Sequence, residues 1–151
     1  MAYKRILVPV DGSSTSARGL AEAMKLARNA RAKLLLLHVI EEYAILAVPD
    51  AGANIGPMLD SLKRAGRTTL GKVERSARRL GVHPETMLVE DFAGRVATAI
   101  VDRAKRWRAD VIVMGTHGRR GLNRVLLGSD AELVVRYSTV PVLLVPARGR
   151  K

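Results

Sequence analysis

Residues 111 to 135 read VIVMGTHGRRGLNRVLLGSDAELVV, and this stretch decides the fold. A short run of β-branched and large apolar residues predicts a buried strand that ends at Gly115. Further glycines follow up to Gly128, and after Ser129 an amphipathic run predicts a helix. A strand, a glycine-rich turn and a helix in this order are typical of α/β domains that bind ligands beyond the carboxyl ends of their strands.

The turn offers two surfaces that favour an anion. Glycine lets the backbone adopt a positive φ and approach a ligand closely, so Gly115, Gly118 and Gly121 can direct successive N–H groups at phosphate. The helix that begins near Gly128 presents unpaired N–H groups and the positive end of its dipole, and the Ser129 hydroxyl adds a donor. We therefore expect this segment to wrap phosphate.

The same loop carries three arginines, Arg119, Arg120 and Arg124. Arginine forms forked, charge-assisted hydrogen bonds with phosphate, although simple solvation explains each of them equally well. We expect His117 at the rim of the site, because no base and orienting group elsewhere in the sequence pairs with it. The loop lacks the Gly-x-x-x-x-Gly-Lys-Ser/Thr pattern of P-loop enzymes, and no Gly-x-Gly-x-x-Gly follows the first strand, which argues against a nicotinamide dehydrogenase.

Elsewhere along the chain, strand patterns alternate with helix patterns. Apolar runs predict strands over residues 4–10, 33–40, 86–89, 109–115 and 141–146. Apolar spacings of three and four predict helices over residues 14–30, 57–80, 91–107 and from about 128 onward, with Gly81 at a helix C-terminus. Residues 41–57 are rich in proline and glycine and predict a long loop or a partly ordered excursion, which could act as a flap. The alternation predicts one α/β domain over residues 1–151, with a parallel sheet and helices on both faces.

Composition narrows the functional classes. The 151 residues include no cysteine, which excludes disulfides and thiol-ligated metals. Lysine and arginine exceed aspartate and glutamate by 26 − 14 = 12, a surplus that attracts nucleic acid, nucleotides or acidic lipid. Aromatic residues make up 3%, too few for a base-stacking platform, and a solvated basic surface accounts for most of the charge. The start of the chain lacks a signal-peptide pattern and no apolar run approaches ~18 residues, which predicts a cytoplasmic protein without a membrane partner.

Several motifs resemble one family. Gly115-x2-Gly118-x9-Gly128-Ser129 resembles the Gly-x2-Gly-x9-Gly-Ser/Thr signature of the ATP-binding universal stress proteins. ILVPVDGS at 6–13 resembles the first strand of that family, LLLLHVI at 34–40 its second, and 109–146 its closing block. The resemblance covers nearly the whole chain. It implies a Rossmann-like fold, a five-stranded parallel sheet in the order 3-2-1-4-5, and a cytosolic stress-response module that binds adenine nucleotide.

The resemblance also implies roles for single residues. Asp11, with Pro9 and Val10, is expected at the adenosine end, where Asp11 bonds the ribose or the adenine, and Val39 is expected to offer backbone hydrogen bonds to adenine. From the residues alone, Asp11 in the sequence DGSS is a turn former or a helix cap.

The phosphate end follows from the same resemblance. The residues expected there are Met114, Gly115, His117, Gly118, Arg119, Gly128, Ser129 and the backbone of Asp130. Asp130 is a departure, because the family commonly has a small or apolar residue at this position. Its carboxylate would repel a γ-phosphate unless it turns away or Mg²⁺ bridges the two, so ADP and AMP stand as alternatives to ATP. An aspartate in a first helical turn also suits the helix dipole without any ligand.

The last strand, PVLLVP, is apolar on both faces and is expected at a sheet edge. The family pairs this strand with its copy, which implies a homodimer through Val142, Leu143, Leu144 and Val145. Shielding of the edge by the C-terminal tail is the alternative.

Three functions can be weighed against these residues. The resemblance favours a module whose nucleotide state controls contacts with a protein partner that the sequence does not identify. A slow or partner-dependent ATPase is the alternative, although no catalytic base stands out. A basic regulator that binds nucleic acid is the third, and no helix-turn-helix or RNA-binding signature supports it.

Overall fold

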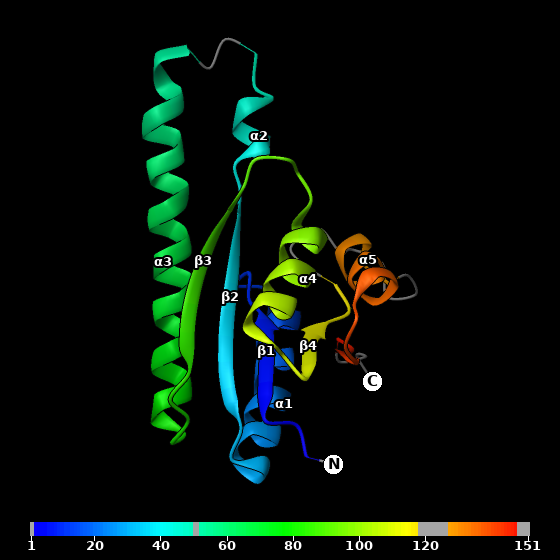
Figure 1. The fold of residues 1–151 in the computed structure, drawn as a ribbon. Coiled ribbons are helices and arrows are strands. Elements are labelled where there is room, and N and C mark those ends of the chain that lie inside the picture. Colours follow the sequence, from blue (N-terminus) through cyan, green and yellow to red (C-terminus); the bar gives the residue numbers. More distant parts are fainter. Residues whose placement is uncertain (1, 50–51, 118–126, 148–151) are drawn as a thin grey trace.

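The computed structural model describes residues 2–49, 52–117 and 127–147, in which strands and helices alternate along the chain (Figure 1). The strands are β1 (Arg5–Pro9), β2 (Lys33–Glu41), β3 (Glu85–Asp91), β4 (Val111–Gly115) and β5 (Val142–Val145). The helices are α1 (Ser14–Ala30), α2 (Tyr43–Leu46), α3 (Ile55–Arg79), α4 (Val96–Trp107) and α5 (Ser129–Tyr137), with a 3₁₀ turn η1 (Gly52–Asn54). Within these ranges no helix has the length and apolarity needed to cross a bilayer.

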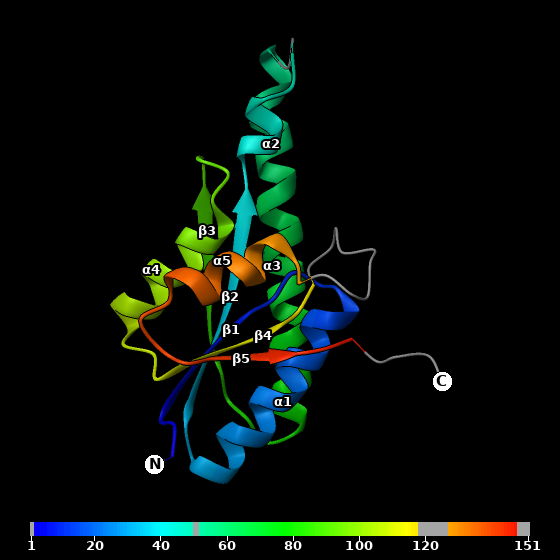
Figure 2. The ribbon, with the colours of Figure 1, turned by 90° about the vertical axis from the view of Figure 1, so that its right-hand side faces the viewer.

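The strands form one parallel five-stranded sheet in the order β3-β2-β1-β4-β5, which confirms the predicted order. Helices α1 and α3 cover one face, and α4 and α5 cover the other (Figures 1 and 2). Since each connecting helix returns against the strand direction, the carboxyl ends of the strands meet at one edge of the sheet. The carboxyl ends of the helices meet at the opposite edge.

The inner strands are buried on both faces, which explains their uninterrupted apolar sequences. In β2, Leu34 and Leu36 pack toward α1 and α3, whereas Leu35 and Leu37 pack toward α4 and α5. All four leucines are at most 1% exposed. Side chains that alternate between two apolar layers fix the register of the sheet, because a shift by one residue would exchange the layers.

Within residues 41–57 the structure has α2 and η1, which agrees with a partly ordered excursion and not with a plain loop. The carbonyl of Glu42 accepts hydrogen bonds from the N–H groups of Ile45 and Leu46, which closes the first turn of α2. Ile45 is buried, and its burial anchors a helix too short to be stable alone. Together with the beginning of α3, α2 stands beyond the end of the sheet (Figure 1).

Helix α4 begins at Val96, five residues later than predicted. Asp91 belongs to β3, and its carboxylate accepts hydrogen bonds from the N–H groups of Ala93 (3.1 Å) and Arg95 (2.6 Å). These bonds hold residues 92–95 in a tight turn, so the helix begins only after it.

Helices α1, α3 and α4 end in the same way. After α3, the Gly81 N–H bonds the Arg78 carbonyl and the Val82 N–H bonds the Ala77 carbonyl, with Gly81 at φ 78°, which confirms Gly81 as the cap residue. The equivalent positions after α1 and α4 are Arg31 (φ 49°) and Arg108 (φ 55°). The left-handed conformation disfavours any residue with a Cβ atom, so these two arginines are held at a cost.

The substitution Arg108→Gly should stabilise the protein by about 0.5–1 kcal/mol, because glycine adopts the left-handed conformation without the Cβ penalty. The free energy of unfolding from urea titration measures the effect. Arg106→Gly, inside the last turn of α4, is the matched control and should destabilise. Equal losses of stability in both variants would contradict the prediction.

Candidate functional site

A cavity of about 630 Å³ opens beyond the carboxyl ends of β1, β2 and β4. The order of the sheet reverses between β1 and β4, which is where open parallel sheets form a ligand crevice. Besides the strand ends, its wall includes residues of α2, α3, α4 and the start of α5. We call this cavity the switch-point pocket.

The predicted site residues converge on this pocket from three separate segments. Those on its wall are Pro9, Val10, Asp11, Val39, Met114, Gly115, His117, Gly128, Ser129 and Asp130. Gly118 and Arg119 lie outside the described residues, as do Gly121, Arg120 and Arg124. The ligand contacts of all these residues remain predictions.

The start of α5 faces the pocket. Gly128 is extended (φ −61°, ψ 148°), and its N–H donates to the Thr116 carbonyl over 2.8 Å, which fixes the helix start to the end of β4. The first helical bond runs from the Glu132 N–H to the Gly128 carbonyl. The first turn of a helix presents N–H groups that no carbonyl of the helix accepts, and glycine supplies no side chain to cap them. This end of the pocket therefore suits an anion.

Asp11 organises the turn between β1 and α1. Its Oδ1 accepts a hydrogen bond from the Ser13 N–H (2.8 Å), and the Ser13 hydroxyl accepts one from the Ser16 N–H (3.1 Å) as the cap of α1. The Ser16 hydroxyl in turn accepts a bond from the Asp11 N–H (3.3 Å). The turn-forming role of Asp11 is thus confirmed, and the same residue lies on the pocket wall.

Val39 presents backbone at the opposite end of the pocket. In a parallel sheet, alternate residues direct both N–H and carbonyl to the same neighbour. The Leu37 carbonyl accepts from the Val10 N–H, so Val39 faces the same side, beyond the end of β1. A donor and an acceptor on one edge suit a flat heterocycle that carries both.

His38 also lies on the pocket wall but was not predicted as a site residue, because it lies within a leucine-rich run. Its ring is buried, and Nδ1 lies 2.7 Å from the Val10 carbonyl oxygen. Because a carbonyl only accepts, Nδ1 carries the proton. A Cβ on Gly66 would lie 2.8 Å from His38 Cδ2, so this glycine lets α3 approach the ring. A lone polar residue in a buried strand was the available signal.

Gly115 lies on the wall for a reason other than the predicted one. It is not among the residues with positive φ. A Cβ at Gly115 would instead lie 2.6 Å from Thr15 Cγ2 and 2.8 Å from the Thr15 backbone. Glycine is therefore required for the contact between β4 and α1, and that contact sets the position of the pocket floor.

The described wall carries carboxylates but no lysine or arginine. The acidic residues are Asp11, Glu41 and Asp130. Over the described ranges, no group of three or more His, Cys, Asp or Glu residues has the arrangement of a metal site. A phosphate ligand would therefore need cations from the loop at 118–126 or from solution.

A buried carboxylate, Glu42, lies at the junction of β2 and α2, beside two partly exposed charged residues. Glu42 is fully buried, and neither of its carboxylate oxygens has a hydrogen-bond partner among the described residues. Lys63 Nζ lies 4.0 Å from Glu42 Oε1 but 2.7 Å from Glu90 Oε1. Burial raises the pKa of the Glu42 carboxyl, Glu90 raises it further, and the Lys63 ammonium lowers it in part. Since Ala44 and Ile45 of α2 line the pocket, this charge lies behind the pocket wall.

The substitution Glu42→Gln should stabilise the protein by about 1 kcal/mol at about pH 8, because it removes a buried charge without a hydrogen bond. The pKa of Glu42 is higher in the folded than in the unfolded protein. The wild type therefore loses stability as the pH rises from the unfolded-state pKa to the folded-state pKa of this carboxyl group. The difference between the two proteins should therefore vanish below about pH 4.

Urea unfolding at a series of pH values measures this difference. Glu90→Gln is the control, because it removes the partially exposed partner of Lys63 and should not stabilise. A Glu42→Gln protein that is less stable than the wild type at neutral pH would show that the carboxylate is favourably paired.

Comparisons with known proteins place this arrangement in context. A model of the universal stress protein family matches residues 2–146. The universal stress protein MJ0531 of Methanocaldococcus jannaschii is 36% identical over 143 residues, which cover 95% of this chain and 82% of that protein.

Solved structures agree with the same family. The structure of MJ0577, also from Methanocaldococcus jannaschii, matches with a TM-score of 0.85 at 27% identity and covers 99% of this chain and 100% of that one. A universal stress protein in complex with cAMP matches with a TM-score of 0.69 at 26% identity and covers 97% of this chain and 98% of that one.

Proposed function

Because this chain belongs to the universal stress protein family, we propose that it binds an adenine nucleotide, ATP before ADP or AMP, in the switch-point pocket. The main support for this proposal is that three segments distant in sequence, at Asp11, Val39 and Gly128, line one cavity of about 630 Å³. That volume falls in the range of small-molecule sites. A related protein in complex with cAMP supports an adenine ligand for this chain.

The nucleotide would lie across the carboxyl ends of the strands. The backbone edge of Val39 suits the donor and acceptor pattern of adenine, and Asp11 accepts from a ribose hydroxyl. The N-terminus of α5, at Gly128 and Ser129, holds the phosphates. Gly118 and Arg119, in the loop between β4 and α5, are proposed to close around them.

Magnesium is included in the proposal because of the acidic wall. Asp130 lies in the first turn of α5, next to the N–H groups proposed for the phosphates. A carboxylate and phosphate oxygens together are ligands that Mg²⁺ accepts. Bound Mg²⁺ would neutralise the repulsion between Asp130 and the outer phosphates.

Helix α2 connects the pocket with the protein surface, so nucleotide binding could change the surface through this helix. Ala44 and Ile45 line the pocket, whereas Tyr43 and Leu46 of the same short helix are exposed. A ligand that moves α2 therefore changes the apolar surface offered to a partner. We propose that the protein acts in the cytoplasm during the stress response and that its nucleotide state controls contacts with an unidentified protein partner.

The substitution Gly128→Val should abolish the stabilisation by ATP. Saturating ATP, at about 100 times its Kd, should stabilise the wild type by about 2.7 kcal/mol. The extended backbone of Gly128 accommodates valine, whose side chain would occupy the approach to the α5 N–H groups. Thermal unfolding with ATP, ADP, AMP and cAMP, each with and without Mg²⁺, measures the effect.

Gly71→Val is the matched control, because a Cβ at Gly71 would meet only the flexible end of Arg75 and Gly71 is not on the pocket wall. It should retain the full stabilisation. A wild-type protein that no adenine nucleotide stabilises, at millimolar concentration and with Mg²⁺, would refute the proposed function.

We further propose that the protein forms a homodimer through the free edge of β5 (Figure 2). Leu143 projects from this strand at 39% exposure, between the partly buried Val142 and Leu144. An apolar edge strand of this kind favours pairing with a second copy through Val142, Leu143 and Leu144, whereas Val145 at the strand end is already buried.

The substitution Leu143→Glu should shift the protein from dimer to monomer, because it places a charge at the centre of the paired edge. Light scattering after gel filtration measures the mass. Leu80→Glu adds the same charge at another exposed leucine, at the end of α3, and should leave the dimer intact. Equal masses for wild type and Leu143→Glu would argue against this interface.

A further inference from the structure

The edge of the sheet at which the strands begin, opposite the switch-point pocket, is strongly basic, and we call it the basic edge. Helices α1, α3 and α4 end there, and β1 and β2 begin there. The basic residues at these ends are Lys4, Arg5, Arg28, Arg31, Lys33, Arg78, Arg79, Lys105, Arg106 and Arg108. Cations favour helix carboxyl ends, but each end carries only about half a negative charge. A positive surplus therefore remains at this edge.

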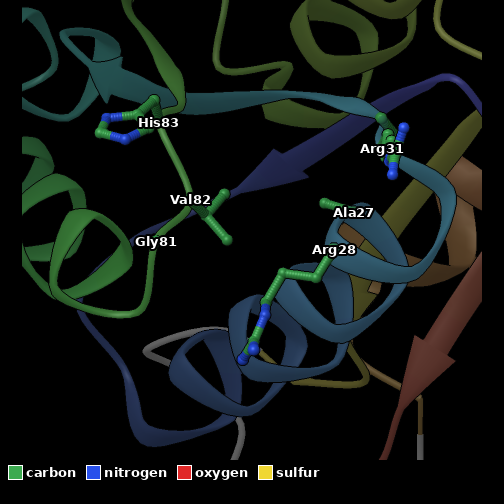
Figure 3. A pocket seen from close by; sticks show the side chains of 7 residues that line it. Ala27, Arg28, Arg31, Gly81, Val82 and His83 are labelled. Atoms are coloured by element: carbon green, nitrogen blue, oxygen red, sulfur yellow. The ribbon is translucent and has the colours of Figure 1, made fainter.

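Within this basic edge lies a second cavity, of about 330 Å³ (Figure 3). Ala27, Arg28, Arg31 and Ala32, at the end of α1, form one side, and Gly81, Val82 and His83 form the other. Figure 3 shows the Val82 side chain pointing toward Ala27 across the opening, whereas the His83 ring points away from α1. The small residues leave space between the two helix ends, and the arginines stand at its rim.

The arginines of this cavity are not neutralised. Arg28 and Arg31 form no ion pair or side-chain hydrogen bond with the described residues, and no carboxylate lines the cavity. Arg78 differs, because it lies 2.8 Å from the Glu74 carboxylate. Arg78 also donates to His83 Nδ1 over 3.1 Å.

The backbone conformation of Arg31 provides a matched comparison for this cavity. Arg31 occupies the left-handed position at which α3 has Gly81. Glycine would be less strained, and strain of this kind persists where surroundings or function demand it. Arg108 has the same conformation after α4 but does not line this cavity. The two residues therefore form a matched pair in which only one faces the opening.

We propose that this cavity is a second anion site, which binds a small, multiply charged phosphate compound such as a phosphate monoester or a short polyphosphate. The guanidinium groups of Arg28 and Arg31, which have no ion pair among the described residues, offer several donors that phosphate oxygens accept. The cavity exceeds the volume of one phosphate ion, which favours a larger phosphate compound. The site lies at the opposite edge of the sheet from the switch-point pocket and does not depend on it.

Inorganic tripolyphosphate is the test ligand, titrated into wild-type, Arg28→Gln, Arg31→Gly and Arg108→Gly proteins by calorimetry. All three variants lose one positive charge at the same edge. Saturable binding should weaken about tenfold or more in Arg28→Gln and Arg31→Gly and change less than about twofold in Arg108→Gly. Arg31→Gly should also melt about 2–4 °C higher than wild type, so its loss of binding cannot come from unfolding.

Amide NMR shifts locate the ligand in the same titration. Shifts at Ala32, Gly81 and Val82 that remain in the Gly128→Val protein support the site. Shifts confined to Ser129 and its neighbours would place the ligand in the switch-point pocket and overturn the proposal. Equal weakening in Arg31→Gly and Arg108→Gly would also overturn it, because it would show a diffuse field of the kind that attracts nucleic acid. A wild type without saturable binding overturns it as well.

Discussion

The structure depends on one constraint, the common direction of its five strands. Parallel strands need crossover helices, and those helices return against the strand direction. All strand carboxyl ends therefore meet at one edge and the carboxyl ends of α1, α3 and α4 at the other. The two edges differ in chemistry as a result: one offers strand ends and the N-terminus of α5, the other a row of basic helix ends.

Close packing of α1 on β4 connects this architecture to the pocket. A Cβ on Gly19 would lie 3.1 Å from the Gly115 nitrogen, and a Cβ on Gly115 would strike Thr15. Two glycines thus bring a helix and a strand together at the point where the sheet order reverses. The pocket floor is positioned by contacts between main chains, which leaves the surrounding side chains available for recognition.

Much of this could be predicted from the sequence. Apolar runs and helical spacings located the main strands and helices, and Gly81 marked a helix end, because these signals are local. The start of α4, the helix at residues 43–46 and the role of Gly115 depend on a carboxylate cap, on the burial of Ile45 and on contact with Thr15. Such contacts join distant residues or need exact side-chain placement, and no periodicity records them. Glu42 was not predicted for the same reason, whereas His38 left a local signal as a lone polar residue in a buried strand.

Thr116 has a consequence for communication within the molecule. Its N–H bonds the carbonyl of Val145 in the edge strand, while its own carbonyl accepts from Gly128 at the start of α5. The backbone of Thr116 is thus hydrogen-bonded both to the end of β5 and to the start of α5. A ligand or partner that displaced one of these elements through Thr116 would change the affinity at the other, and thermodynamic reciprocity would make the effect equal in both directions. The proposed association along β5 and the proposed ligand occupancy beside α5 would thereby be energetically linked.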